Sequence, residues 1–206
     1  MIGKEKDPAQ DAFLKDFYLP DPAKKEENCI SEIGSFLSRS IPLSGSREEL
    51  LKEAGELIRH ITEFEEISFG ALDDDGLYRY HGMIGYREEA VNARREIVYD
   101  SRYISDGIAF RSIRTGRNSH IYLTEFKPFK SGEEMSFNHP ELLGEPRKNA
   151  DDMVEGDYLD IFLYGKQKKV IGWIELSGHR DGKLPTREEM LHLEYFATCL
   201  SLSMSS

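Results

Sequence analysis

Apolar positions along the chain recur in two patterns, a spacing of three to four residues typical of helices and an alternation typical of strands. The clearest helical pattern follows the capping box 46–49, in which a serine and a glutamate each bond a free backbone N–H group. Apolar residues from Leu50 to Ile61 then form one stripe. A second capping box, 186–189, predicts a C-terminal helix to about Leu202.

The strand pattern is strongest in Tyr158–Tyr164 and Val170–Ser177, which flank the short polar segment 165–169 and therefore predict a β-hairpin. A loop with an even number of residues fixes by parity which positions share a face. One face is then entirely apolar and consists of Leu159, Ile161, Leu163, Gly172, Ile174 and Leu176. The other mixes aromatic rings with two carboxylates and consists of Tyr158, Asp160, Phe162, Trp173 and Glu175. The apolar face requires helices packed on it, whereas the second suits either a lined pocket or a surface open to solvent.

Four further strands are predicted, over 67–72, 77–84, 97–99 and 118–123. Helices are predicted over 86–96 and over 106–115; in the second, Asp106 caps the start, Gly116 ends the helix, and the apolar residues turn inward. Residues 124–157 form a long connection with three prolines and three phenylalanines, which favours an ordered lid over a mobile loop.

We interpret the first 45 residues as a helical appendage and residues 46–206 as a single domain. The segments 7–9 and 21–23 both read Asp-Pro-Ala, a helix-start signal, and predict helices over 8–18 and 22–38. These helices pack either on the main domain or on a second copy of the chain. Because the apolar stripe of the C-terminal helix is wide, we expect burial on two of its sides and a homodimer through the terminal helices.

Composition narrows the class of protein. The chain has 206 residues, of which 39% are hydrophobic and 32% charged, as in soluble globular proteins. Its formal net charge of −11 argues against a general nucleic-acid surface, which needs clustered Lys and Arg. The N-terminus has no apolar signal region, and there is no uncharged apolar run of about 18 residues. The expectation is a cytoplasmic protein that binds neither nucleic acid nor membrane.

Two motifs, 105–118 (Ser-Asp-Gly-Ile-Ala-Phe-Arg-Ser-Ile-Arg-Thr-Gly-Arg-Asn) and 170–176 (Val-Ile-Gly-Trp-Ile-Glu-Leu), occur in order between capped helices. Over about residues 47–204 the chain thereby resembles the GAF family of small-molecule sensor domains. The resemblance implies an α+β fold with a central antiparallel sheet of about six strands. The N- and C-terminal domain helices would cover one face, and short helices and the long connection would cover a pocket on the other. It also implies a regulatory domain that binds a small molecule and signals through its terminal helices to a partner protein or to a neighbouring domain.

The residues expected to contact such a ligand come from the second face of the hairpin and from the segments predicted to cover it. They are Tyr103, Asp106, Phe110, His120, Asp160, Trp173 and Glu175. Trp173 would offer a stacking surface, and the carboxylates and His120 would orient the ligand. For each residue, core packing or surface display is an equally good interpretation.

The sequence names no cofactor. The Asn-Lys-Phe-Asp-Glu signature of cyclic-nucleotide-binding GAF domains is absent, and no cysteine lies near the pocket strands where bilin-binding members attach their chromophore. The histidines form no metal-ligand motif, so no metal site is expected.

Two other functions stay open beside the sensor. The first is a scaffold with a filled pocket that binds no ligand and serves dimerisation only. The second is a small-molecule enzyme that uses the carboxylates Asp160 and Glu175, or one that reduces methionine sulfoxide. Members of the family with the latter activity rely on cysteines in the pocket region, whereas Cys29 and Cys199 fall in predicted peripheral helices. An enzyme is therefore the less favoured interpretation.

Overall fold

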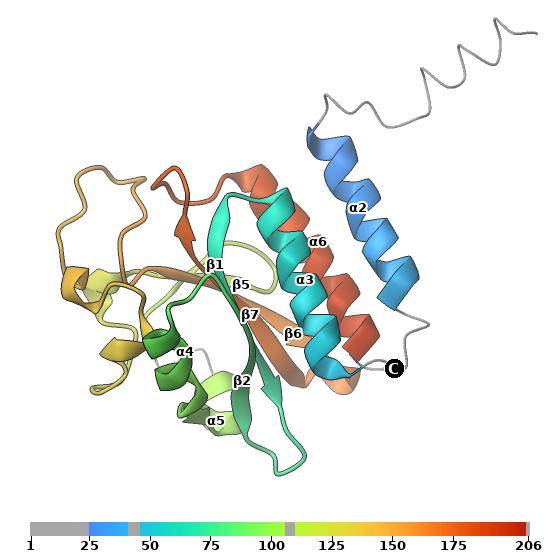
Figure 1. Cartoon of the computed structure of the whole chain (residues 1–206), viewed down its shortest axis with the longest axis horizontal. Helices are drawn as coiled ribbons and strands as arrows, with labels where there is room; N and C mark the ends of the chain where they lie inside the picture. Colours follow the sequence, from blue (N-terminus) through green and yellow to red (C-terminus); the bar gives the residue numbers. More distant parts are fainter. Residues whose placement is uncertain (1–24, 41–45, 106–109, 205–206) are drawn as a thin grey trace, which may run out of the picture.

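A computed structural model of the chain describes residues 25–40, 46–105 and 110–204. Its centre is one antiparallel sheet of seven strands in the order β3-β2-β1-β7-β6-β5-β4 (Figure 1). The strands are β1 (Phe64–Leu72), β2 (Tyr78–Ile84), β3 (Val98–Tyr99), β4 (Ile113–Arg114), β5 (Ser119–Tyr122), β6 (Tyr158–Tyr164) and β7 (Val170–His179). The α+β class and the antiparallel sheet are confirmed, with β4 as one strand more than expected.

The β6–β7 hairpin has the register that parity predicted. Asp160 pairs with Glu175 and Phe162 with Trp173 on one face, while Leu159 pairs with Leu176 on the other. A register shift after Leu163 absorbs the odd residue of the loop, where the 3-10 turn η4 (Lys166–Lys168) lies. The apolar face of the hairpin is fully buried in the main core.

Two helices cover this apolar face, α3 (Arg47–Ile61) and α6 (Arg187–Met204), and a third, α2 (Lys25–Ser40), packs on these two (Figure 1). The capping boxes predicted for the starts of α3 and α6 both form. Leu51 and Ile58 of α3 and Leu193 of α6 are completely buried, because their helical spacing places them over the sheet. Among the described residues, no helix is long and apolar enough to cross a membrane.

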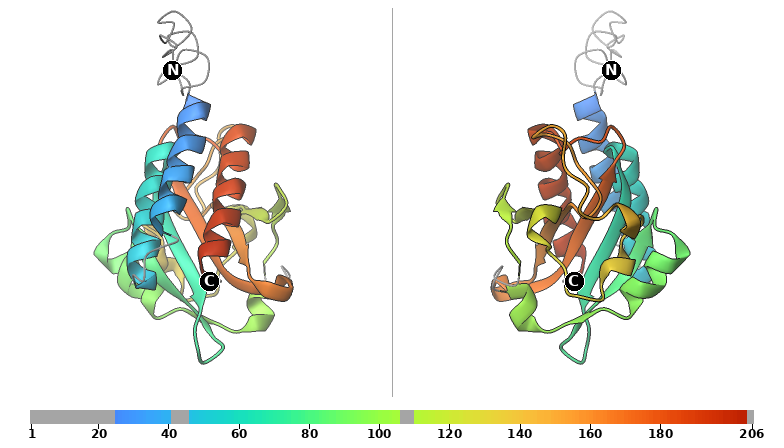
Figure 2. Two further views of the ribbon diagram at one scale, coloured as in Figure 1. Left: turned by 90° about the vertical axis from the view of Figure 1, so that its right-hand side faces the viewer. Right: turned by 90° about the vertical axis from the view of Figure 1, so that its left-hand side faces the viewer.

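The helix α2 is part of the same core. Its residues Cys29, Ile33 and Phe36 are buried, and the Phe36 ring lies 5.3 Å from that of Phe196 in α6. Figure 2 shows α2 lying across α3 and α6 on the side of these helices away from the sheet. The other predicted helix of the appendage, 8–18, lies outside the described residues, and the boundary at residue 45 stays a prediction.

The opposite face of the sheet carries α4 (Glu88–Arg95), α5 (Ser101–Ser105) and the long connection from β5 to β6 (Figure 1). The connection is ordered around three 3-10 turns, η1 (Thr124–Phe126), η2 (Glu134–Ser136) and η3 (Pro140–Leu142). We call residues 124–157 the lid. Its ordered state agrees with the sequence prediction.

The prediction of a helix over 106–115 is wrong for residues 110–115, which the structure describes. The short helix is α5, which ends at Ser105, and residues 113–114 form strand β4 instead. Ile113 pairs with Ile121 of β5 and is 50% exposed rather than turned inward, and Thr115 N–H donates to the Ser119 carbonyl to close the turn. Pairing with the sheet edge satisfies these backbone groups and so replaces the helix. Residues 106–109 lie outside the described part of the chain.

Candidate functional site

A cavity of about 60 Å³ lies between the second face of the sheet and the lid, α4 and α5. On this measure about 10–15 Å³ holds one water molecule, so the cavity has room for several waters or a small ligand. Ten of the eighteen described residues that line it are aromatic: Tyr80, Tyr99, Tyr103, Phe110, Tyr122, Phe129, Phe137, Tyr158, Phe162 and Trp173. The charged residues among these eighteen are Arg94, Glu133, Asp160 and Glu175.

Trp173 forms the floor of the cavity because the residue opposite it in β1 is a glycine. A Cβ atom at Gly70 would lie 2.1 Å from the indole ring, so any larger residue would displace the ring. Tyr80 and Tyr99 meet the same ring edge-on, with centroids 5.4 and 6.0 Å away. Trp173 is 2% exposed in this position.

A buried ion pair crosses the cavity between α4 and β7. Arg94 Nη1 donates to Glu175 Oε1 in a short contact, and both residues are at most 5% exposed. The Tyr80 hydroxyl donates to the other oxygen, Oε2, at 2.6 Å, so both oxygens of Glu175 are engaged. Burial disfavours the charged guanidinium, but Glu175 together with Tyr86 and Tyr80 outweighs burial, and the pKa of Arg94 is raised.

Asp160 differs from Glu175 in having a buried oxygen without a partner. Its Oδ1 atom is buried and makes no hydrogen bond. Burial, and after it the negative charge of Glu175 on the paired strand, hold the pKa of Asp160 well above its usual range, against the opposite influence of Arg94. A buried acceptor without a partner destabilises the folded protein. A ligand that donates a hydrogen bond to this oxygen would remove the destabilisation.

Several hydrogen bonds anchor the lid over the cavity. The Tyr158 hydroxyl donates to the Pro128 carbonyl at 2.6 Å, and Arg94 Nε donates to the Ser136 carbonyl at 2.9 Å. Asn138 is buried and reaches the sheet, with its Nδ2 atom donating to Glu66 Oε1 at 2.7 Å. The lid is therefore tied to β6, α4 and β1, and Arg94 belongs both to the lid contacts and to the ion pair.

The structure brings five of the seven predicted site residues around the cavity: Tyr103, Phe110, Asp160, Trp173 and Glu175. His120 pairs with Asp160 across β5 and β6 but does not line the cavity; its Nδ1 atom lies 3.1 Å from Ser112 Oγ and its ring meets Phe162 edge-on. His120 therefore lies beside Phe162 rather than among the described lining residues, and its contact with a ligand stays a prediction. Asp106 lies outside the described residues. Ligand contact by the five stays a prediction.

Sequence reasoning missed Arg94, Tyr80 and Tyr99. Arg94 lies in the charged helix 86–96, where charge normally indicates exposure to solvent. The alternation of residues in β2 could have indicated Tyr80. Tyr78 and Tyr80 are two positions apart and therefore lie on one face of the sheet, where they pack with Trp173 of β7.

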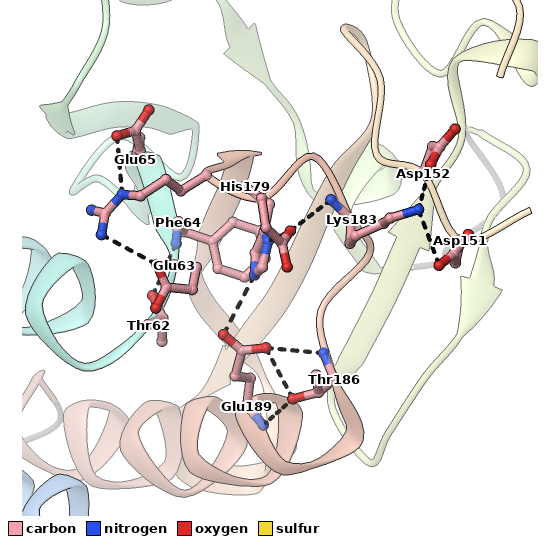
Figure 3. A network of polar contacts seen from close by, with 12 residues as sticks. Thr62, Glu63, Phe64, Glu65, Asp151, Asp152, His179, Lys183, Thr186 and Glu189 are labelled. Atoms are coloured by element: carbon pink, nitrogen blue, oxygen red, sulfur yellow. Dashed lines mark hydrogen bonds and ion pairs between the residues drawn. The ribbon is translucent and has the colours of Figure 1, made fainter. Parts of the chain in front are cut away.

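Polar contacts link the far end of β7 and the end of the lid to α6 (Figure 3). His179 is buried, with Nδ1 2.6 Å from Asp181 Oδ1 and Nε2 3.4 Å from Oε1 of Glu189, the residue that caps α6. Lys183 Nζ lies 2.7 Å from Asp152 in the lid. Burial lowers the His179 pKa, but the two carboxylates outweigh it and the pKa is raised; that of Glu189 falls to about 2 through its bond with His179.

The sequence matches no protein-family model, and no curated protein matches it. Many solved structures are similar in fold, including the following three. The GAF domain/HD domain protein from Geobacter sulfurreducens has a TM-score of 0.55 and 14% identity, with coverage of 82% of this chain and 95% of that chain. The nlh2 GAF domain of A. aeolicus in an inactive state has a TM-score of 0.54 and 14% identity, with coverage of 87% and 95%. The fRMsr of Staphylococcus aureus in its reduced form has a TM-score of 0.51 and 11% identity, with coverage of 86% and 95%.

The chain therefore has a GAF-like fold, as the sequence motifs implied. At identities of 11–14% the likeness establishes the fold alone.

Proposed function

We propose that this chain is a sensory domain of cytoplasmic signalling that binds a small molecule in the cavity between its sheet and its lid. The observation that carries the proposal is the unpartnered Oδ1 of Asp160 on the wall of a cavity lined by aromatic rings. A site evolved only for packing would fill this space or pair the carboxylate, because both a void and an unsatisfied buried acceptor destabilise the fold. The GAF-like fold, which a domain of a putative two-component sensor histidine kinase from Sinorhizobium meliloti 1021 shares, supports the same function.

The output of the domain would pass through α6. The lid is joined to α6 through Lys183, Asp181 and His179, and β5 is joined to it where Glu194 Oε1 accepts from Ser119 Oγ at 2.8 Å. A ligand that changes the position of the lid would therefore change the contacts that join the lid to α6. Such coupling requires that the ligand bind one arrangement of α6 more tightly than another.

A reductase function has less support, although the S. aureus fRMsr shares the fold. Cys29 and Cys199 lie in α2 and α6, on the side of the sheet opposite the cavity, and both are buried. Burial also raises the Cys199 pKa, which disfavours the reactive thiolate.

Native mass spectrometry of the freshly purified protein, repeated after mild denaturation, tests the proposal without a guess about the ligand. We expect a small-molecule adduct that denaturation releases, or else stabilisation by at least one metabolite in a thermal-shift screen. Trp173→Ala should lose this stabilisation, whereas Tyr164→Ala, at the exposed end of β6, should keep it. A clean mass together with no stabilisation by any metabolite would favour the dimerisation scaffold.

We also propose that the terminal helices form a homodimer interface. Leu191, Tyr195 and Leu202 follow one face of α6 and are 60, 50 and 68% exposed, and Ile30 of α2 is 54% exposed. Apolar side chains exposed on adjoining helices favour association with a second copy. Light scattering should give the mass of a dimer for the wild type and of a monomer for Leu191→Glu; a monomeric wild type would refute this interface.

A further inference from the structure

Acidic side chains outnumber basic ones around the cavity. Of the described lining residues three are acidic and one, Arg94, is basic, and Arg94 is already engaged by Glu175, Ser68 and Ser136. Glu175 is in turn bonded by Arg94 and Tyr80, which leaves Asp160 with the unpartnered oxygen. An anionic ligand would meet Asp160 and Glu133 with no free counter-charge among the described lining residues.

The aromatic residues that line the cavity also favour a cationic ligand over an anionic one. The face of an aromatic ring carries partial negative charge and attracts an ammonium group within about 6 Å of its centroid. Tyr80, Tyr99 and Trp173 form one group of rings on the floor, and Tyr122 of β5 and Tyr158 of β6 stack with centroids 4.6 Å apart. Rings combined with a carboxylate are the surroundings in which proteins hold alkylammonium ligands.

The protein places an ammonium of its own against this wall. Lys130 of the lid has its Nζ atom 4.0 Å from the ring centroid of Tyr103 and 4.7 Å from that of Tyr99. The same atom lies 3.9 Å from Glu133 Oε1. Both tyrosines and Glu133 line the cavity, so the residues around it already bind one alkylammonium group.

We infer that the ligand of this cavity is a small organic cation of the alkylammonium class, held among the aromatic rings that line the cavity, including Trp173 and Tyr99, and by the carboxylate of Asp160. This inference rests on the proposed ligand-binding function and names the chemistry of its ligand.

Binding should also depend on pH. A cation favours the ionised form of Asp160, whose pKa burial and Glu175 raise in the empty cavity, so binding should release a proton and strengthen as pH rises. The titratable and charged groups around Asp160 are Glu175 and Arg94, His120 at the paired position of β5, and the tyrosines 80, 99, 122 and 158. None of the tyrosines ionises near neutral pH, because burial raises their pKa values further.

Calorimetric titration with three ligands of matched shape tests the inference. The probes are choline, its uncharged isostere with a tert-butyl group in place of trimethylammonium, and the anion tert-butylacetate. Wild type should bind choline at least about tenfold more tightly than either other probe, and more tightly at pH 8 than at pH 6. Asp160→Asn should lose roughly ten- to a hundredfold in choline affinity together with the pH dependence. Asp74→Asn, which removes the same charge from an exposed turn, should bind as the wild type does.

Each other outcome has a distinct meaning. Equal or tighter binding of the isostere or the anion would overturn the cationic ligand and leave the ligand-binding function standing. Binding of none of the three, with no adduct in native mass spectrometry, would overturn both. Should Asp160→Asn fail to fold, Tyr99→Leu serves instead: it should weaken choline binding about threefold or more and leave the isostere unaffected.

Discussion

Replacing Asp160 by asparagine should raise the free energy of unfolding of the ligand-free protein, and the increase should grow as the pH rises. The side chains have nearly the same shape, so the change removes an ionisable group without opening a void. Burial and the adjacent Glu175 raise the Asp160 pKa in the folded state. The folded protein therefore retains a proton that the unfolded chain releases above its own pKa of about 3.9.

The sign and size follow from proton linkage. Where the folded state binds more protons than the unfolded state, the free energy of unfolding falls as pH rises. Between the unfolded pKa and the raised folded pKa, the wild type should lose about 1.4 kcal/mol per pH unit relative to the variant. Below the unfolded pKa both states are protonated and the pH-dependent difference disappears; above the folded pKa it is constant.

Urea unfolding of the wild type, Asp160→Asn and Asp74→Asn at a series of pH values from about 4 to 8 measures this difference. We expect the first two curves to diverge with rising pH, while Asp74→Asn follows the wild type because Asp74 is exposed. Parallel curves, or an asparagine variant less stable than the wild type at pH 7, would refute the reasoning about Asp160.

Three further changes test other parts of the structure. Glu175→Gln leaves the buried Arg94 without its counter-charge and should cost about 3 kcal/mol or more in urea unfolding at pH 7; a loss below about 1 kcal/mol would contradict the ion pair. The charged form of His179 stabilises the fold fully below its unfolded pKa of about 6.5, so stability relative to His179→Gln should fall as pH rises through the raised folded pKa, in thermal melts from about pH 6 to 9. A relative stability that increases over that range would contradict the contacts with Glu189. Gly70→Ala places a methyl group against the Trp173 ring and should cost about 1–3 kcal/mol with a shift in tryptophan emission, and an unchanged spectrum would show that the ring lies elsewhere.

The features predictable from sequence are those set by local interactions. The capping boxes at Ser46 and Thr186 involve residues three apart, and the faces of the β6–β7 hairpin follow from strand parity across a short loop. This was enough to place Asp160, Trp173 and Glu175 on one face, and the resemblance to GAF domains implied that this face lines a pocket.

The features that the sequence concealed depend on distant partners. Arg94 is buried because Glu175, 81 positions later, and the Ser136 carbonyl of the lid surround its guanidinium, and no pattern within its own helix indicates this. Strand β4 has only two residues and exists through its pairing with β5, so local preference favoured a helix there. His120 shares a face with Asp160, but its place behind Phe162 depends on how the rings pack.

The central claim is that the cavity beneath the lid receives a small molecule, and Trp173 allows a direct measurement because it is the only tryptophan of the chain. Its indole N–H gives a single side-chain resonance in a proton–nitrogen correlation spectrum, which reports on the cavity floor. The account predicts that this resonance shifts saturably when choline is added to the wild type and much less in Asp160→Asn. An indole resonance that stays in place with choline and with both of its matched probes would contradict the account.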